Sequence, residues 1–240
     1  MFKPAKWMYF FLLTGITIFP NPKILAKDLS AFKSRTTYEN IDVQSIQQWD
    51  SYEQVNQYFL LVRDTRFIED PKIKGTYRRI SWMLPDFGCN ARAALAIEYL
   101  KKFKNLLLPN KLFIFVDHKV GPLLIETNFS PEGDVEWMEH VALVVRVKNQ
   151  VYVLDPSIEL SRPLELDQWI SVMTNDKRSL SFSVCDSDTF EPADDCNHPK
   201  IDLKNALKQQ NTCLVLERRR VKKLGLDPDL VLGDEPPWSK

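Results

Sequence analysis

Three residues with catalytic potential, Cys89, His140 and Asp155, each stand at the end of a predicted secondary-structure element. Cys89 follows Gly88 after a Pro85-Asp86 turn, and an alanine-rich helical run begins at once. The first turn of a helix offers free backbone N–H groups and the positive end of the helix dipole. Both favour a thiolate, so the position of Cys89 suits a nucleophile.

His140 and Asp155 border two apolar runs and complete the set that a cysteine nucleophile needs. His140 opens the run at 141–145, and Asp155 closes the run at 151–154. A histidine can hold a thiolate as an ion pair and then act as general acid and base, while an aspartate orients the imidazole. A single cysteine is commonly a small buried hydrophobe, and a histidine at a strand start is commonly structural. The order of the three residues, each at an element end, gives the catalytic role the same weight as the structural one.

The two apolar runs predict a β-hairpin, and its register decides whether His140 meets Asp155. A two-residue turn at Asn149-Gln150 would leave His140 about 13 Å from Asp155 along the strand. A connection centred two residues earlier would set the pair directly opposite, with Cβ atoms about 5 Å apart. Both registers place the two side chains on one face of the sheet. We therefore predict a wider or bulged loop rather than the tight turn.

Other periodic segments supply the elements that would position these residues. Helices are predicted over 89–104 and 163–173, with a helical stripe from Ile46 to Val62 that packs on the core. Strands are predicted over 112–116, 180–184 and 213–216. Residues 117–136 read as a longer polar connection that borders the substrate cleft.

The segments around the three residues resemble those of the bacterial protein glutaminases, which are protein-glutamine deamidases. The resemblance covers about residues 78–216 and rests on several motifs: Arg79-Ile80-Ser81-Trp82, Pro85-Asp86, Gly88-Cys89-Asn90-Ala91-Arg92-Ala93, His140-Val141-Ala142, Asp155-Pro156-Ser157 and Asn211-Thr212-Cys213-Leu214-Val215-Leu216. It implies an α+β fold with a papain/transglutaminase-like core, in which the nucleophile helix packs on an antiparallel β-sheet. It also implies that Asn211–Leu216 is the closing strand of that sheet.

The resemblance implies hydrolysis of glutamine side-chain amides in proteins or peptides, with glutamate and ammonia as products and a thioester on Cys89. No cofactor or metal is expected. The backbone N–H of Cys89 is the expected first oxyanion donor, and the Trp82 indole is a candidate second donor, although a core role for Trp82 is favoured. A transglutaminase, a cysteine peptidase and a non-catalytic secreted binding module are the alternatives, because the triad alone does not separate them.

Composition and the first residues indicate an exported globular protein. The chain is 44% hydrophobic and 27% charged with zero formal net charge, so no nucleic-acid partner is implied. Residues 1–26 resemble a secretory signal, with Lys3 and Lys6 before an apolar run at 7–19 and a cleavage site at Ala26. That run is too short to span a bilayer comfortably, although an uncleaved anchor is the alternative. We expect a secreted or periplasmic protein without stable membrane insertion after signal removal.

The remaining chain divides into a helical segment, a catalytic domain and a tail. Residues 27–75 form the N-terminal helical segment, which packs on the core or, as the resemblance suggests, serves as an inhibitory pro-segment. The catalytic domain is expected over 76–223, and its basic end at 218–223 reads as a solvated run. Residues 224–240 are rich in proline, glycine and aspartate and are expected to form a flexible tail.

The chain has four cysteines, of which Cys89 is reserved for catalysis. Cys185 and Cys196 bracket an acidic loop, and in an exported protein they are predicted to form a disulfide. Cys213 is then a buried strand cysteine. A metal site formed by Cys185, Cys196, His198 and Cys213 is the alternative, but its spacing matches no common zinc pattern.

Overall fold

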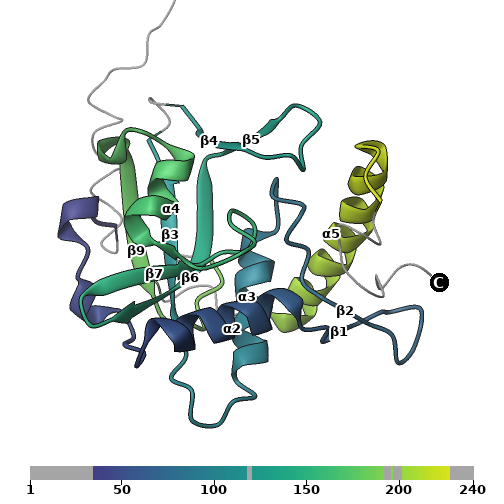
Figure 1. Cartoon of the computed structure of the whole chain (residues 1–240), viewed down its shortest axis with the longest axis horizontal. Coiled ribbons are helices and arrows are strands. Elements are labelled where there is room, and N and C mark those ends of the chain that lie inside the picture. Colours follow the sequence, from purple (N-terminus) through teal and green to yellow (C-terminus); the bar gives the residue numbers. More distant parts are fainter. Residues whose placement is uncertain (1–34, 118–120, 192–195, 197–201, 228–240) are drawn as a thin grey trace, which may run out of the picture. The chain divides into compact units, whose positions relative to one another are not determined.

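The computed structural model describes residues 35–117, 121–191, 196 and 202–227, all within the unit that spans residues 33–240 (Figure 1). The predicted signal at 1–26, His118, His198 and most of the predicted tail therefore lie outside the described residues. Within the described part of the chain, no helix combines the length and apolar character needed to cross a membrane.

A five-stranded antiparallel sheet forms the centre of the fold, with strand order β8-β7-β6-β3-β9 (Figure 1). Its strands are β3 Asn110–Val116, β6 Glu139–Val147, β7 Gln150–Leu154, β8 Leu164–Glu165 and β9 Leu180–Cys185. Most residues of β3 and β6 are buried, because apolar side chains on both faces of these central strands pack against other elements. Two smaller antiparallel pairs accompany the sheet, β1 Ile68–Glu69 with β2 Tyr77–Arg78 and β4 Leu123–Glu126 with β5 Asp134–Trp137.

Helices cover both faces of the sheet and create two hydrophobic clusters. On one face, Phe113 and Leu143 pack in a cluster with residues of α2 Tyr52–Asp64 and α3 Cys89–Leu100. On the other face, Leu112 and Val144 pack in a cluster with α4 Leu166–Met173. This alternation along the strands follows from the two-residue period of β-structure. The predicted α+β class, with the nucleophile helix packed on an antiparallel sheet, is confirmed.

Three short 3₁₀ helices and a long C-terminal helix complete the described elements. The short ones are η1 Tyr38–Asn40, η2 Val43–Ser45 and η3 Lys177–Ser179, and the long one is α5 Leu203–Lys223. The helix α2 begins at Tyr52, after an N-cap at Ser51 whose side chain accepts from the Gln54 N–H. The predicted stripe from Ile46 is therefore wrong before this cap, although Ile46 is buried as expected.

The predicted closing strand at Asn211–Leu216 is wrong, because these residues lie in the middle of α5. The helix begins after Asp202, whose side chain accepts from the Asn205 N–H. Its buried residues recur at helical spacing and are Ala206, Gln210, Cys213, Leu214, Glu217 and Val221. Two of these buried positions, Gln210 and Glu217, carry polar side chains and interrupt the helical pattern of apolar residues. The apolar residues that remain, at 213–216, are consecutive and therefore resemble a short strand. Cys213 is buried as predicted, but on a helix.

The predicted wide loop between β6 and β7 is also wrong. Val147 pairs with Gln150, so a two-residue turn at Lys148-Asn149 joins the strands. Lys148 adopts a left-handed conformation with φ 56°, which a tight hairpin turn requires and a lysine rarely adopts. The polar connection predicted at 117–136 contains the β4–β5 hairpin instead of a loop alone.

The predicted disulfide between Cys185 and Cys196 is confirmed, and Cys89 and Cys213 are free thiols. The disulfide removes two of the four side chains of the alternative metal site. Among the described residues, no cluster of histidine, cysteine and acidic side chains is arranged to hold a metal ion.

Candidate active site

Gly88 and Cys89 form the turn that opens α3. Gly88 has φ 88°, a left-handed conformation that glycine adopts at little cost. A Cβ atom at Gly88 would also lie 3.0 Å from Cys213 Sγ, so both the backbone and the close packing require glycine. The turn makes Cys89 the first residue of α3, where the backbone N–H groups have no intrahelical partner.

The structure brings Cys89, His140 and Asp155 together. His140 Nε2 lies 2.7 Å from Asp155 Oδ2, and His140 also forms a hydrogen bond with the side chain of Cys89. Because Asp155 occupies Nε2, Nδ1 is the ring nitrogen that remains for Cys89. The three side chains thus form a continuous chain from helix start to strand end, as the sequence analysis expected.

The tight hairpin still permits this contact because the pair is diagonal. The last β6–β7 pair is Leu143 with Leu154, so Asp155 follows directly after the paired region. Extending the register sets Asp155 across from Ala142, two residues from His140 and on the same face. Diagonal neighbours on a sheet face have Cα atoms about 7–8 Å apart, a distance that a histidine and an aspartate span together.

Two tryptophans and a serine fix the histidine and the aspartate. The Trp137 ring stacks on His140 with centroids 4.1 Å apart and an interplanar angle of 11°. Trp169 donates from Nε1 to Asp155 Oδ2 at 3.0 Å. Ser157 donates to Asp155 Oδ1 from its backbone N–H at 3.1 Å and from its hydroxyl at 2.5 Å. Both carboxylate oxygens are therefore engaged, and the imidazole is held in one orientation.

Sequence reasoning did not assign roles to these three supporting residues. Trp169 belongs to the apolar side of the helix predicted over 163–173, and Trp137 lies just beyond the polar connection predicted over 117–136, in no predicted element. Ser157 carried a usable signal, because an aspartate two residues before a serine N–H is a common Asx turn. That turn holds the Asp155 carboxylate close to the backbone that follows it.

The three side chains hold one another's pKa values away from the ordinary ones. Burial raises the pKa of Cys89, but the hydrogen bond and charge of His140, together with the charge of Arg92, lower it overall. Burial lowers the pKa of His140, but Asp155 and Cys89 raise it to about 9. Burial raises the pKa of Asp155, but His140 and the donors on Ser157 and Trp169 bring it to about 2. The arrangement thus favours a thiolate, an imidazolium and a carboxylate.

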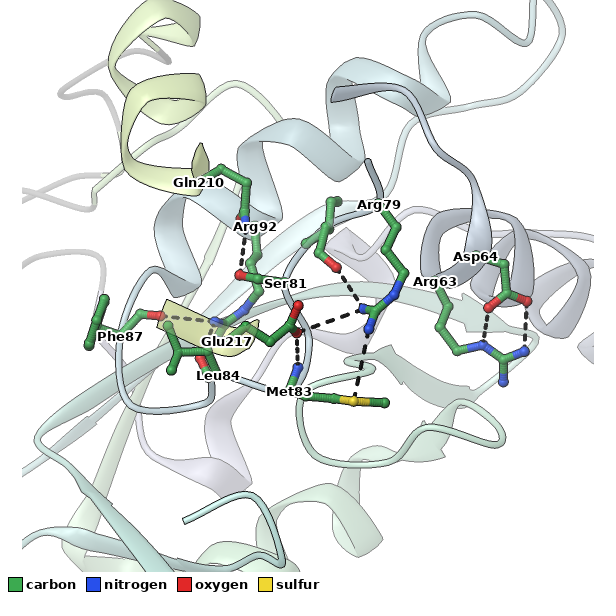
Figure 2. Close-up of polar contacts among 11 residues, drawn as sticks. Arg63, Asp64, Arg79, Ser81, Met83, Leu84, Phe87, Arg92, Gln210 and Glu217 are labelled. Atoms are coloured by element: carbon green, nitrogen blue, oxygen red, sulfur yellow. Dashed lines mark hydrogen bonds and ion pairs between the residues drawn. The ribbon is translucent and has the colours of Figure 1, made fainter. Parts of the chain in front are cut away.

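Arg92, one turn after Cys89 on α3, holds the loop that leads into the nucleophile (Figure 2). Its side chain is buried, and Nη1 donates to the carbonyl oxygens of Leu84 and Phe87, each at 2.9 Å. The guanidinium therefore fixes the turn before Gly88 and also supplies positive charge near Cys89.

The helix α5 also holds this loop. Glu217 accepts from the Met83 N–H at 2.7 Å and lies 3.8 Å from the Arg79 guanidinium, while Gln210 donates to the Ser81 hydroxyl (Figure 2). Further contacts at the two ends of the loop join Arg78 to Asn211 and Asp86 to Arg220. The segment from 78 to 86 is thus fixed by one helix before the chain reaches Cys89.

Several buried polar atoms around this loop lack a hydrogen-bond partner among the described residues. They are Arg78 Nε, Trp82 Nε1, Arg92 Nη2, Gln210 Oε1 and Glu217 Oε2. Trp82 packs within the core cluster that also contacts Cys89, as the core interpretation expected. Its indole N–H nevertheless has no acceptor, which a purely structural tryptophan would normally find.

The comparisons with known proteins concern the part of the chain that holds this site. A family model described as Glutaminase matches residues 55–173, which include Cys89, His140 and Asp155. No curated protein matches the chain by sequence. Among solved structures, the chain is similar to a crystal structure of pro-protein-glutaminase, with a TM-score of 0.52 and 16% identity over 80% of this chain and 68% of that chain.

Two further structures are similar at a lower score. The NMR structure of protein-glutaminase from Chryseobacterium proteolyticum has a TM-score of 0.49 and 19% identity, covering 68% of this chain and 84% of that chain. A crystal structure of protein-glutaminase has a TM-score of 0.48 and 16% identity, covering 81% of this chain and 95% of that chain. The similarity to the pro-protein-glutaminase structure concerns the fold.

Proposed function

Residues 55–173 of this chain belong to the glutaminase family, and we propose that the protein hydrolyses glutamine side-chain amides in proteins or peptides. The products are glutamate and ammonia. The observation that carries this proposal is the buried contact of His140 with Asp155 and Cys89 inside the family segment. In this assignment Cys89 is the nucleophile, His140 the general acid and base, and Asp155 the residue that orients the imidazole.

The reaction begins when the Cys89 thiolate attacks the carbon of the side-chain amide. The carbon–sulfur bond forms as the carbonyl π electrons move to oxygen, which gives a tetrahedral oxyanion. The oxyanion then collapses, and the imidazolium of His140 protonates the leaving nitrogen, so ammonia departs and a thioester remains on Cys89. Neutral His140 next takes a proton from water, which attacks the thioester and releases glutamate and the thiolate.

The developing oxyanion needs hydrogen-bond donors that are in place before the reaction. The backbone N–H of Cys89 lies at the start of α3 and has no intrahelical acceptor. The indole N–H of Trp82, which has no acceptor among the described residues, supports the assignment of Trp82 as the second donor. Arg92 and α5 fix the loop that carries both groups.

The alternatives share the first attack and differ in what accepts the acyl group or which bond breaks. A transglutaminase passes the thioester to a lysine amine, and a cysteine peptidase cleaves the backbone. A secreted binding module would carry an idle triad. The test is a parallel assay of ammonia release, lysine cross-linking and backbone cleavage on one unfolded glutamine-rich protein.

The expected result is ammonia release from an amine-free substrate, with glutamate in place of glutamine and an intact backbone. Cys89→Ser should lose nearly all of this activity, because a serine hydroxyl beside this histidine is a much weaker nucleophile than a thiolate. Wild-type ammonia release by Cys89→Ser would reject the nucleophile assignment. Cleavage or cross-linking without ammonia release would reject the deamidase while leaving the fold unchanged.

The site of action is proposed to be outside the cytoplasm. The disulfide Cys185–Cys196 supports an oxidising compartment, where such bonds form and persist. The sequence pattern of residues 1–26 supports secretion or export to the periplasm. Labelling of denatured, unreduced protein should detect two thiols per chain, on Cys89 and Cys213.

A further inference from the structure

A groove of about 850 Å³ is lined by residues of α5 on one side and by residues of the β1–β2 pair and its connection on the other. Arg78 joins its two sides, because the guanidinium contacts Asn211 on α5 and lies 3.6 Å from Asp70 next to β1. The inner face of α5 is occupied by the contacts to the loop before Cys89. The groove therefore lies on the side of α5 that does not contact the loop before Cys89.

The floor of the groove is apolar and open to solvent. Leu207 and Val215 line it with 37% and 45% of their surface exposed, and Leu216 lies beside them. Exposed apolar side chains that gather in a concave surface with a polar rim are typical of a binding site. Among the described residues, nothing covers this floor beyond the residues that line it.

The rim of the groove carries an excess of positive charge. Lys72, Lys204, Lys208 and Arg219 line it, and none of these four forms a salt bridge with another described residue. A second hollow along the same helix adds Lys222. The one acidic residue of the groove, Asp70, faces the Arg78 guanidinium. The groove thus offers several cations around an apolar floor.

We propose that this groove binds an acidic segment of the protein substrate that also carries apolar side chains, an inference that rests on the proposed function. Carboxylates would contact the lysine and arginine rim, and leucine-like side chains would cover Leu207 and Val215. An apolar floor of this kind has no complement on a bare phosphate chain, so an acidic polypeptide fits better than a nucleic acid. The groove would select acidic protein substrates while the triad supplies the chemistry.

The test compares Lys204→Glu/Lys208→Glu with a matched control, Lys102→Glu/Lys104→Glu. Both double variants make the same change in charge at exposed positions, but the control positions lie outside the groove. The substrates are a capped glutamine dipeptide and two long peptides with one glutamine each. One long peptide carries aspartates and leucines, and the other replaces the aspartates with serine.

The groove variant should raise KM for the acidic peptide about tenfold, because two attractions become repulsions. Its kinetics on the capped dipeptide and on the serine peptide should stay within about twofold of wild type, as should all kinetics of the control variant. The difference in KM for the acidic peptide between the groove variant and wild type should become smaller in about 0.5 M salt, because salt screens the charges. An unchanged KM for the acidic peptide in the groove variant would overturn the proposal.

A binding measurement keeps the groove separate from the chemistry. Fluorescence anisotropy measures the Kd of the labelled acidic peptide for the Cys89→Ala protein, which cannot turn over the peptide. Adding Lys204→Glu/Lys208→Glu to this protein should raise the Kd about tenfold. Absence of ammonia release from the dipeptide would reject the proposed function, while this titration would still test the groove. Three results would each assign another occupant to the groove and overturn the proposal. Equal affinity for oligothymidylate would indicate a nucleic acid, and peptide binding only after removal of residues 228–240 would indicate the chain's own C-terminal residues. A salt-sensitive dimer that the groove variant no longer forms would indicate a second copy of the chain.

Discussion

Glu217 of α5 accepts a hydrogen bond from the backbone N–H of Met83 at 2.7 Å, and the side chain of Glu217 is fully buried. Met83 lies in the loop that ends at Cys89, so this bond links the C-terminal helix to the position of the nucleophile. The family segment ends at residue 173, so this contact comes from outside it. We interpret Glu217 as a positioning residue for the catalytic loop.

Glu217→Ala should lower the free energy of unfolding by about 3–5 kcal/mol, because it leaves the buried Met83 N–H without its acceptor and the buried Arg79 guanidinium without its acidic partner. At a temperature where the variant is fully folded, kcat and the alkylation rate of Cys89 should still decrease, with little change in KM for the capped dipeptide. Glu217→Gln, whose amide oxygen can accept the Met83 bond, should restore most of kcat. Loss of stability with unchanged kcat and alkylation would assign Glu217 a structural role only.

Cys89 and Cys213 should differ strongly in reactivity. The pKa of Cys89 is lowered overall, because His140 and Arg92 outweigh burial, whereas burial raises the pKa of Cys213. Near neutral pH, iodoacetamide should therefore modify Cys89 first, with a half-maximal rate at a pH below the ordinary thiol value of about 8.5. His140→Ala should shift that pH upward. Peptide mapping of the alkylated protein would identify the site, and faster labelling of Cys213 would contradict the assignment.

Asp155→Asn should lower kcat by up to about 10⁴-fold while leaving the fold intact, because an amide favours the wrong imidazole tautomer. Stability should also become less dependent on pH. The pKa of Asp155 is about 2, below its unfolded value of about 3.8, so its stabilisation is present above that value and is lost as pH falls through 2. The pKa of His140 is about 9, above its unfolded value of about 6.5, so that contribution is complete below 6.5 and is lost as pH rises through 9.

Urea unfolding from pH 2 to pH 10 measures this difference. The free energy of unfolding of wild type should exceed that of Asp155→Asn most clearly between about pH 4 and 6.5. This difference in free energy should become smaller toward pH 2 and toward pH 10. A constant difference at every pH would mean that the substitution acts through packing and not through the ion pair.

The contact between His140 and Asp155 could be predicted because strand alternation places both on one face in either register. The turn could not be predicted, since it depends on Lys148 in a left-handed conformation that sequence preference disfavours. The hairpin β4–β5 was hidden because its buried residues, such as Leu123 and Trp137, alternate with polar ones over only a few positions. The predicted contact is right although the predicted register is wrong, because the side chains of His140 and Asp155 are long enough to meet as a diagonal pair.

The helix α5 was not predictable from an apolar period alone. Gln210 and Glu217 occupy buried positions on its inner face, because they hydrogen-bond to the loop and not to solvent. Replacing these two polar residues by apolar ones in the pattern would have produced an evident helical stripe. The residues that hide the helix from sequence analysis are thus those that connect it to the catalytic loop.

Trimming the chain through residue 75 should destabilise it and should not activate it. Val55, Phe59 and Val62 of α2 are fully buried in the cluster that also holds α3, and the family segment begins at residue 55. Removing several such side chains costs about 2–5 kcal/mol each, which exceeds the stability of a typical domain. A leader cleavage compatible with the fold would have to fall before Ile41, because Ile41, Ile46 and Trp49 are buried as well. Limited proteolysis with an ammonia assay tests this, and higher turnover after complete removal of 27–75 would support the inhibitory leader instead.

Trp82→Phe should separate the two roles considered for Trp82. The indole nitrogen is buried and has no acceptor among the described residues, while the ring packs in the core. Phenylalanine keeps most of the packing but removes the N–H, so an oxyanion donor predicts a loss of kcat of about 10²–10³-fold with nearly constant KM. The pH dependence of Cys89 alkylation should not change, because the thiolate and His140 are untouched. A variant with reduced stability but wild-type kcat would show that Trp82 serves only the core, and the second oxyanion donor would then have to come from the backbone of the loop that α5 holds.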